Sequence, residues 1–166
     1  MRTALAFAAL ALVAGAGAAQ VDPFAFLPDG GRGLLVRALP TPEAQAQALS
    51  ETRSAADWQA ALAATGLTER ETATLAAYLS RVAPLAPAQA LPPDGRDLAL
   101  AQCQSCHSLF SGYLMQRRDR NGWLVVFASP FHKDLPMSPT EREIFADYSA
   151  INMPMRVEDV PPEMRF

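Results

Sequence analysis

The amino-acid sequence predicts an all-α fold. Two capping boxes, at 68–71 and 138–141, each open a stretch whose apolar residues recur at helical spacing. No alternation of strand and helix patterns is present, and fourteen prolines in 166 residues mark breaks between short helices. The length suits one domain, or one small domain with an extension.

Start signals and apolar spacing predict six helices. They are expected over 41–49, over 55–64, from Thr68 to Val82, from Asp94 into Cys103, over 122–127 and from Ser138 to Ser149. The segments 20–40 and 150–166 are expected to be irregular, because glycine or proline recurs in them. We also expect 108–121 to be mostly loop.

The N-terminus has the pattern of a secretory signal peptide. Arg2 precedes an almost entirely apolar run over 3–14, and the small residues of 16–19 follow. An apolar run of this length is shorter than the ~20 residues that span a bilayer. We therefore expect cleavage near Ala19 and export to the periplasm, with an uncleaved anchor as the alternative.

The sequence Cys103-Gln104-Ser105-Cys106-His107 is the pattern of c-type haem attachment. Residues three apart on a helical turn lie on one side, so both thiols can form thioethers with the vinyl groups of one haem. His107 would then bind the iron as its proximal ligand. The alternatives are a disulfide, a thioredoxin-like dithiol, and a zinc site completed by His132.

At this motif the chain resembles class I cytochromes c, which are small helical electron carriers. The resemblance covers roughly 93–151: Gly95 lies eight residues before Cys103, as the first-helix glycine does in that family. The segment 143–149, with Tyr148, is similar to the family's C-terminal helix. The resemblance implies a small cytochrome c fold with one covalent haem c, and single-electron exchange with a redox partner protein.

The expected organisation has five parts. A signal peptide over 1–19 precedes a helical N-terminal region without a haem motif over 20–83. A proline-rich linker over 84–93, the cytochrome c domain over 94–151 and a proline-rich tail over 152–166 follow. No part of the mature chain is expected to span the membrane. A net charge of −3 lacks the basic character of a nucleic-acid-binding surface.

The two halves share a weak internal repeat. The segments 67–78 and 137–148 each begin with an apolar residue and a capping box and end in a tyrosine, and Trp58 and Trp123 precede them. Two ordinary capped helices explain this pattern, and so does a duplicated domain whose first copy lost its haem motif. In either case the first half contains neither cysteine nor histidine.

The second axial iron ligand is expected from the loop before the C-terminal helix. In small bacterial members of the family, a Met lies five residues before the apolar residue that precedes the helix cap. Here that apolar residue is Met137, and counting back five gives His132, the only other histidine. We predict His132 as the ligand, with Met137 as the main alternative. Because a Met ligand raises the reduction potential, His132 predicts a lower-potential carrier.

A basic patch at 117–120 precedes Trp123. An arginine there, Arg118 in our prediction, would pair with a haem propionate, and the indole N–H of Trp123 could donate to the same group. The alternative is a solvated loop that docks a redox partner.

Together these features predict a periplasmic monohaem cytochrome, either a free carrier or the cytochrome subunit of a periplasmic dehydrogenase. No catalytic residue is predicted. The alternative function is a haem-based enzyme or sensor that binds a small ligand at an open sixth site.

Overall fold

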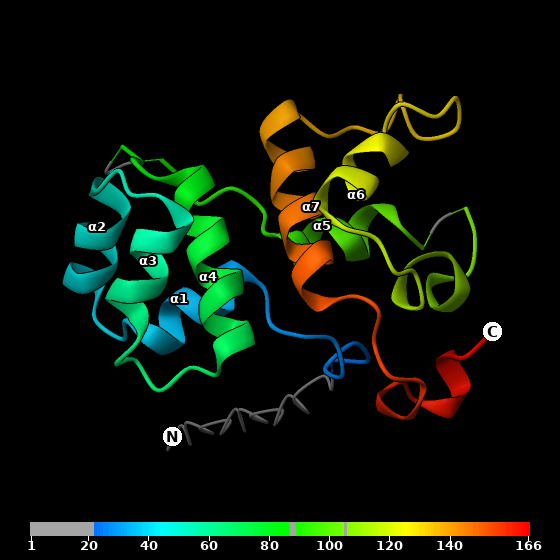
Figure 1. The fold of residues 1–166 in the computed structure, drawn as a ribbon, viewed down its shortest axis with the longest axis horizontal. Helices are drawn as coiled ribbons and strands as arrows, with labels where there is room; N and C mark the ends of the chain where they lie inside the picture. The colour runs from blue at the N-terminus through cyan, green and yellow to red at the C-terminus, as the bar shows by residue number, and fades with distance from the viewer. Residues whose placement is uncertain (1–21, 87–88, 105) are drawn as a thin grey trace, which may run out of the picture.

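A computed structural model of the chain describes residues 22–86, 89–104 and 106–166. In these ranges the chain forms helices and no strand, which confirms the all-α prediction (Figure 1). None of the described helices has the length and apolar character needed to cross a membrane. The predicted signal peptide over 1–19 lies outside the described residues, as do residues 87–88 of the predicted linker and Ser105 of the motif.

Seven α-helices and three short turns make up the described part of the fold. They are α1 (Gly31–Ala38), α2 (Pro42–Ser50), α3 (Ala55–Leu62), α4 (Glu69–Val82), α5 (Gly95–Gln102), the π-helical turn η1 (Phe110–Leu114), α6 (Arg120–Val126), α7 (Pro139–Asn152), and the 3-10 turns η2 (Val157–Asp159) and η3 (Pro162–Met164). Both predicted capping boxes are present, at the starts of α4 and α7. The tail after α7 is largely irregular, as expected, apart from η2 and η3.

Helix α1 corrects the expectation of an irregular segment over 20–40. Its apolar residues Leu34 and Leu35 are fully buried. Its N-cap residue, Gly30, offers no side chain, but the carboxylate of Asp94 accepts a hydrogen bond from the Arg32 amide at 2.9 Å. A cap from 62 residues away thus stabilises a helix whose own sequence lacks one.

Asp94 also caps its own helix. Its side chain accepts from the Asp97 amide of α5 at 3.0 Å, so one carboxylate serves the N-termini of two helices. Only 3% of Asp94 is exposed, and burial raises the pKa of its carboxyl group. Backbone N–H donors and the positive ends of two helix dipoles offset part of the cost of burying this charge.

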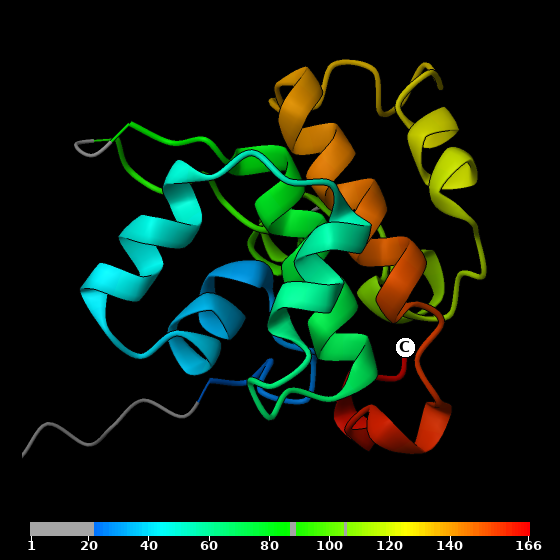
Figure 2. The same ribbon diagram turned by 60° about the vertical axis from the view of Figure 1, so that its left-hand side comes forward.

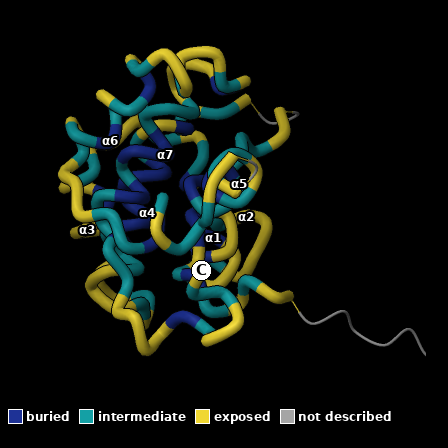
Figure 3. Tube along the Cα trace, turned by 90° about the vertical axis from the view of Figure 1, so that its right-hand side faces the viewer, coloured by how far each residue is buried: buried dark blue, intermediate teal, exposed yellow. Residues whose placement is uncertain are grey.

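Helices α4 and α7 pack against each other at the centre of the molecule (Figure 2). Helices α1 and α3 pack on α4, while α5 and α6 pack on α7. Buried residues accordingly gather along these two central helices (Figure 3). The N-terminal helices surround a core cluster of their own, and α5 to α7 contribute most of a second one.

The same close packing of a glycine and a tyrosine occurs in both halves. A Cβ atom on Gly31 of α1 would come within 2.3 Å of the Tyr78 ring in α4. A Cβ atom on Gly95 of α5 would come within 2.1 Å of Tyr148 Cβ in α7. Only glycine therefore permits either pair of helices to approach this closely.

The two tyrosine hydroxyls cross between the halves. Tyr78 donates to the carbonyl oxygen of Pro92, which precedes α5, at 2.6 Å. Tyr148 donates to the carbonyl oxygen of Pro28, which precedes α1, at 2.7 Å. This reciprocal arrangement supports the duplicated-domain interpretation of the repeat, which stays a prediction.

Replacing Gly95 by alanine is expected to lower the free energy of unfolding by about 1–3 kcal/mol, the usual cost of overpacking a close contact. The matched control is Gly33→Ala, because a Cβ there meets nothing within 4 Å. Alanine in that helix interior should stabilise by about 0.5–1 kcal/mol. Urea unfolding followed by circular dichroism measures both changes, and equal midpoints for the two variants would contradict the close packing.

Candidate functional site

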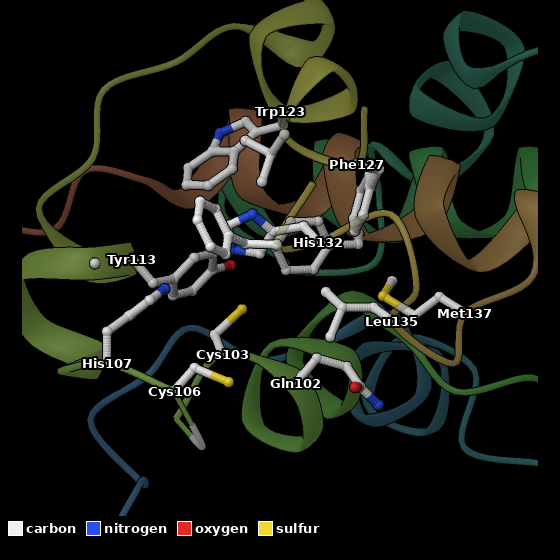
Figure 4. A pocket seen from close by; sticks show the side chains of 14 residues that line it. Gln102, Cys103, Cys106, His107, Tyr113, Trp123, Phe127, His132, Leu135 and Met137 are labelled. Carbon is white, nitrogen blue, oxygen red and sulfur yellow. The ribbon is translucent and has the colours of Figure 1, made fainter. Parts of the chain in front are cut away.

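A cavity of about 370 Å³ lies beside the C-terminal end of α5, α6 and the loop that leads into α7 (Figure 4). Its wall is largely aromatic and aliphatic, and its volume falls in the ~300–1,000 Å³ range of ligand pockets. All four Cys and His side chains of the chain line it: Cys103, Cys106, His107 and His132.

The two cysteines lie on one wall of this cavity, across from Trp123 and Phe127 (Figure 4). Helix α5 ends at Gln102, so the motif follows the helix rather than lying on a full helical turn. Cys103 forms the C-cap, and its amide donates to the Ala99 carbonyl oxygen at 2.9 Å. Burial raises the pKa of the Cys103 thiol to about 12.

The His107 ring rests against the backbone of the π-helical turn η1. A Cβ atom on Gly112 would come within 2.1 Å of His107 Nδ1, so the glycine provides the space for the ring. Nδ1 lies 3.3 Å from the Ser108 carbonyl oxygen, a partner to which it can donate. This arrangement leaves Nε2 for a ligand, as is usual for metal-binding histidines.

His132 faces His107 across the cavity. Their ring centroids are 6.3 Å apart, and the ring planes are inclined by 66°. A metal–imidazole bond is about 2 Å long, and each ring centre lies roughly 1 Å beyond its nitrogen, so two rings on opposite sides of one metal ion stand about 6 Å apart. The observed separation would therefore allow both rings to hold one metal ion between them.

The loop that carries His132 is attached to α7. The Arg142 guanidinium donates to the carbonyl oxygens of Lys133, Leu135 and Met137, at 2.9, 3.4 and 3.2 Å. It also lies 5.2 Å from the ring centroid of Phe127, which lines the cavity. This contact joins the loop to the aromatic wall.

Met137 lines the same cavity and is 7% exposed, so both candidates for the second axial position reach it. Three other methionines between the motif and residue 160 do not line this cavity. Met153 is buried in the core, and Met115 and Met155 pack against the same cluster. None of these three is among the described residues that line the cavity.

Trp123 and Arg118, the two predicted propionate partners, have different positions. Trp123 lines the cavity, and its buried indole N–H has no hydrogen-bond partner among the described residues. An unsatisfied buried donor is costly, and a carboxylate bound in the cavity could satisfy it. Arg118 is exposed; its guanidinium lies 5.7 Å from the Trp123 ring centroid but not in the cavity wall. Arg120 of the same patch already pairs with Asp147 at 2.7 Å.

Aromatic rings from three elements form the inner wall. Tyr113 and Phe127 each pack on Phe145, with centroids 5.6 and 5.5 Å apart, and Trp123 lies 5.3 Å from Tyr113. The Tyr113 hydroxyl forms a 2.8 Å hydrogen bond with the Ser149 hydroxyl, so this buried polar group is satisfied. This wall is apolar, and its one phenol group, that of Tyr113, has a partner.

Sequence reasoning missed the supporting residues Gly112, Tyr113, Ser129 and Arg142. Each acts through a contact that becomes visible only when the loops are folded. Throughout the described ranges, this cavity included, no three His, Cys, Asp or Glu side chains gather closely enough to hold a metal ion by themselves. A tetrahedral zinc site, which needs four such ligands, therefore gains no support.

In the chain prepared without haem, Cys103 is expected to react with iodoacetamide more slowly than Cys106 at mildly alkaline pH. Cys106 is exposed, whereas the raised pKa of Cys103, about 12, leaves little thiolate to react. Tandem mass spectrometry of the alkylated peptide measures the two rates, with the urea-unfolded chain as the control in which they converge. Equal rates in the folded chain would contradict the burial of Cys103.

Comparison with known proteins adds no family to this site: no protein-family model matches the chain, and no curated protein or solved structure is significantly similar to it.

Proposed function

We propose that the chain is a monohaem c-type cytochrome that transfers single electrons. The observation that carries this proposal is the convergence of Cys103, Cys106, His107 and His132 on one apolar cavity. Two thiols on one wall and two facing imidazoles form a donor set that suits a covalently attached haem. The space at Gly112 and the unsatisfied N–H of Trp123 fit the same group.

Each residue has a distinct part in this proposal. Cys103 and Cys106 would hold the haem through thioether bonds, and His107 and His132 would bind its iron through Nε2. Trp123 would donate to a propionate. The bound haem supplies a one-electron Fe(III)/Fe(II) couple. The aromatic wall would shield one side of that couple from water, which would limit the reorganisation that accompanies electron transfer.

If His107 and His132 both bound the iron, electron transfer would be favoured over the alternative of an enzyme or sensor, because no position would be left for a small ligand. His in place of Met would also lower the reduction potential. We also propose export to the periplasm, on the basis of the signal-peptide pattern. A free carrier and a dehydrogenase subunit are both compatible with the site.

The absorption spectrum of the protein exported with a cytochrome maturation system tests the proposal. We expect low-spin haem bands in both oxidation states, without the weak far-red band of a Met–iron bond. Protein that carries no haem would refute the proposal. His132→Ala should yield a high-spin or externally ligated iron, while Met137→Leu, the matched control in the same cavity, should remain low-spin. The opposite pattern would make Met137 the ligand.

Gly112→Ala is expected to reduce the fraction of low-spin haem, because the added Cβ would occupy the place of the His107 ring. The fall should be about tenfold or more if the ring cannot retain its position, the range seen when groups that orient a metal ligand are lost. Pyridine haemochrome analysis separates covalent attachment from ligation. Gly33→Ala is the control, and an unchanged spectrum in Gly112→Ala would show that His107 does not depend on this contact.

A further inference from the structure

The loop between α6 and α7 holds the His132 ring by a hydrogen bond from within its own turn. Ser129 Oγ lies 2.8 Å from His132 Nδ1. The backbone closes the same turn, because the amides of His132 and Lys133 donate to the Ser129 carbonyl oxygen at 3.1 and 3.0 Å. The hydroxyl and the ring are thus brought together by a folded turn of four residues.

The chemistry of imidazole makes this bond informative. A neutral ring carries one proton, so a ring that binds metal through Nε2 carries its proton on Nδ1. The Ser129 hydroxyl oxygen can accept a hydrogen bond from that N–H group, and this bond also fixes the orientation of the ring. If the hydroxyl donated instead, Nε2 would carry the proton and could not bind a metal.

We propose that Ser129 is a positioning residue that accepts a hydrogen bond from the Nδ1–H group of His132. This bond presents Nε2 to the cavity and so selects His132 over Met137 as the second axial ligand. This inference rests on the proposed function.

The selection is needed because the competing donor is well placed. Met137 lines the cavity, is buried, and stands just before the Ser138 cap of α7, with its amide donating to the Leu135 carbonyl oxygen at 2.7 Å. His132 lies in the middle of the loop, next to Phe131, which is 91% exposed. Arg142 holds the backbone that follows His132, whereas Ser129 holds the ring itself.

The test is a titration of the oxidised, haem-loaded protein with free imidazole, which competes with His132 for the iron. The hyperfine-shifted haem methyl signals in the NMR spectrum follow the replacement, because the absorption spectra of the two bis-imidazole forms hardly differ. Ser129→Ala should need about 10–100-fold less imidazole for half replacement, the usual loss when a partner that orients a metal ligand is removed. Ser129→Thr and Ser129→Val form the matched pair, because they share a shape and differ in the hydroxyl. Threonine should retain wild-type behaviour and valine should resemble alanine. Ser80→Ala, in α4, removes a hydroxyl that bonds to the Ala77 carbonyl oxygen and should change nothing.

The outcomes separate this inference from the proposed function. A Met–iron band that appears in Ser129→Ala or Ser129→Val, but not in Ser129→Thr, supports the selection of His132. Wild-type imidazole affinity in both Ser129→Ala and Ser129→Val, with a bis-imidazole spectrum in the parent protein, overturns the role of Ser129 and leaves the proposed function standing. A Met–iron band in the parent protein overturns both the His132 assignment and this inference.

Discussion

The buried carboxylate of Asp94 is the contact on which most of this architecture depends. It accepts backbone N–H groups from the first turns of both α1 and α5, so the two helices begin at one point. Helix α5 runs from this point to Gln102, and its C-cap residue, Cys103, lies in the cavity wall. The start of α1 places Leu34 and Leu35 in the N-terminal core. A carboxylate that lies outside the candidate site thus contributes to the geometry of both halves.

The candidate site combines a rigid side with a loop side. Helices α5 and α7 provide the rigid side, because Gly95 allows them to pack in direct contact. The loop side carries His132, and it depends on the hydrogen bonds donated by Arg142 and on the one between Ser129 and the His132 ring, rather than on burial. Preorganisation of this kind would matter for the proposed electron transfer, because a metal site that changes little between oxidation states exchanges electrons faster.

The sequence predicted those parts of the molecule that depend on local chemistry. Capping boxes are local, and the helices that begin after Thr68 and Ser138 are where they were expected. His132 was predicted as a ligand from its spacing to the next helix, and its ring lies 6.3 Å from that of His107 in the fold; its role as a ligand stays a prediction. Helix α1 was missed because its cap comes from Asp94, far along the chain. Gly112 was missed for a similar reason, since a small residue in a loop has no distinguishing pattern until a ring packs on it.

The crossed hydroxyl bonds of Tyr78 and Tyr148 have a consequence for how the chain holds together. The proline-rich segment between the halves has the composition of a hinge, yet each half contributes an acceptor that the other half needs. Cutting the chain there would leave two buried phenols and the first turn of α1 without their partners. The two halves should accordingly unfold in one cooperative transition, and neither should be recoverable as an autonomous folding unit.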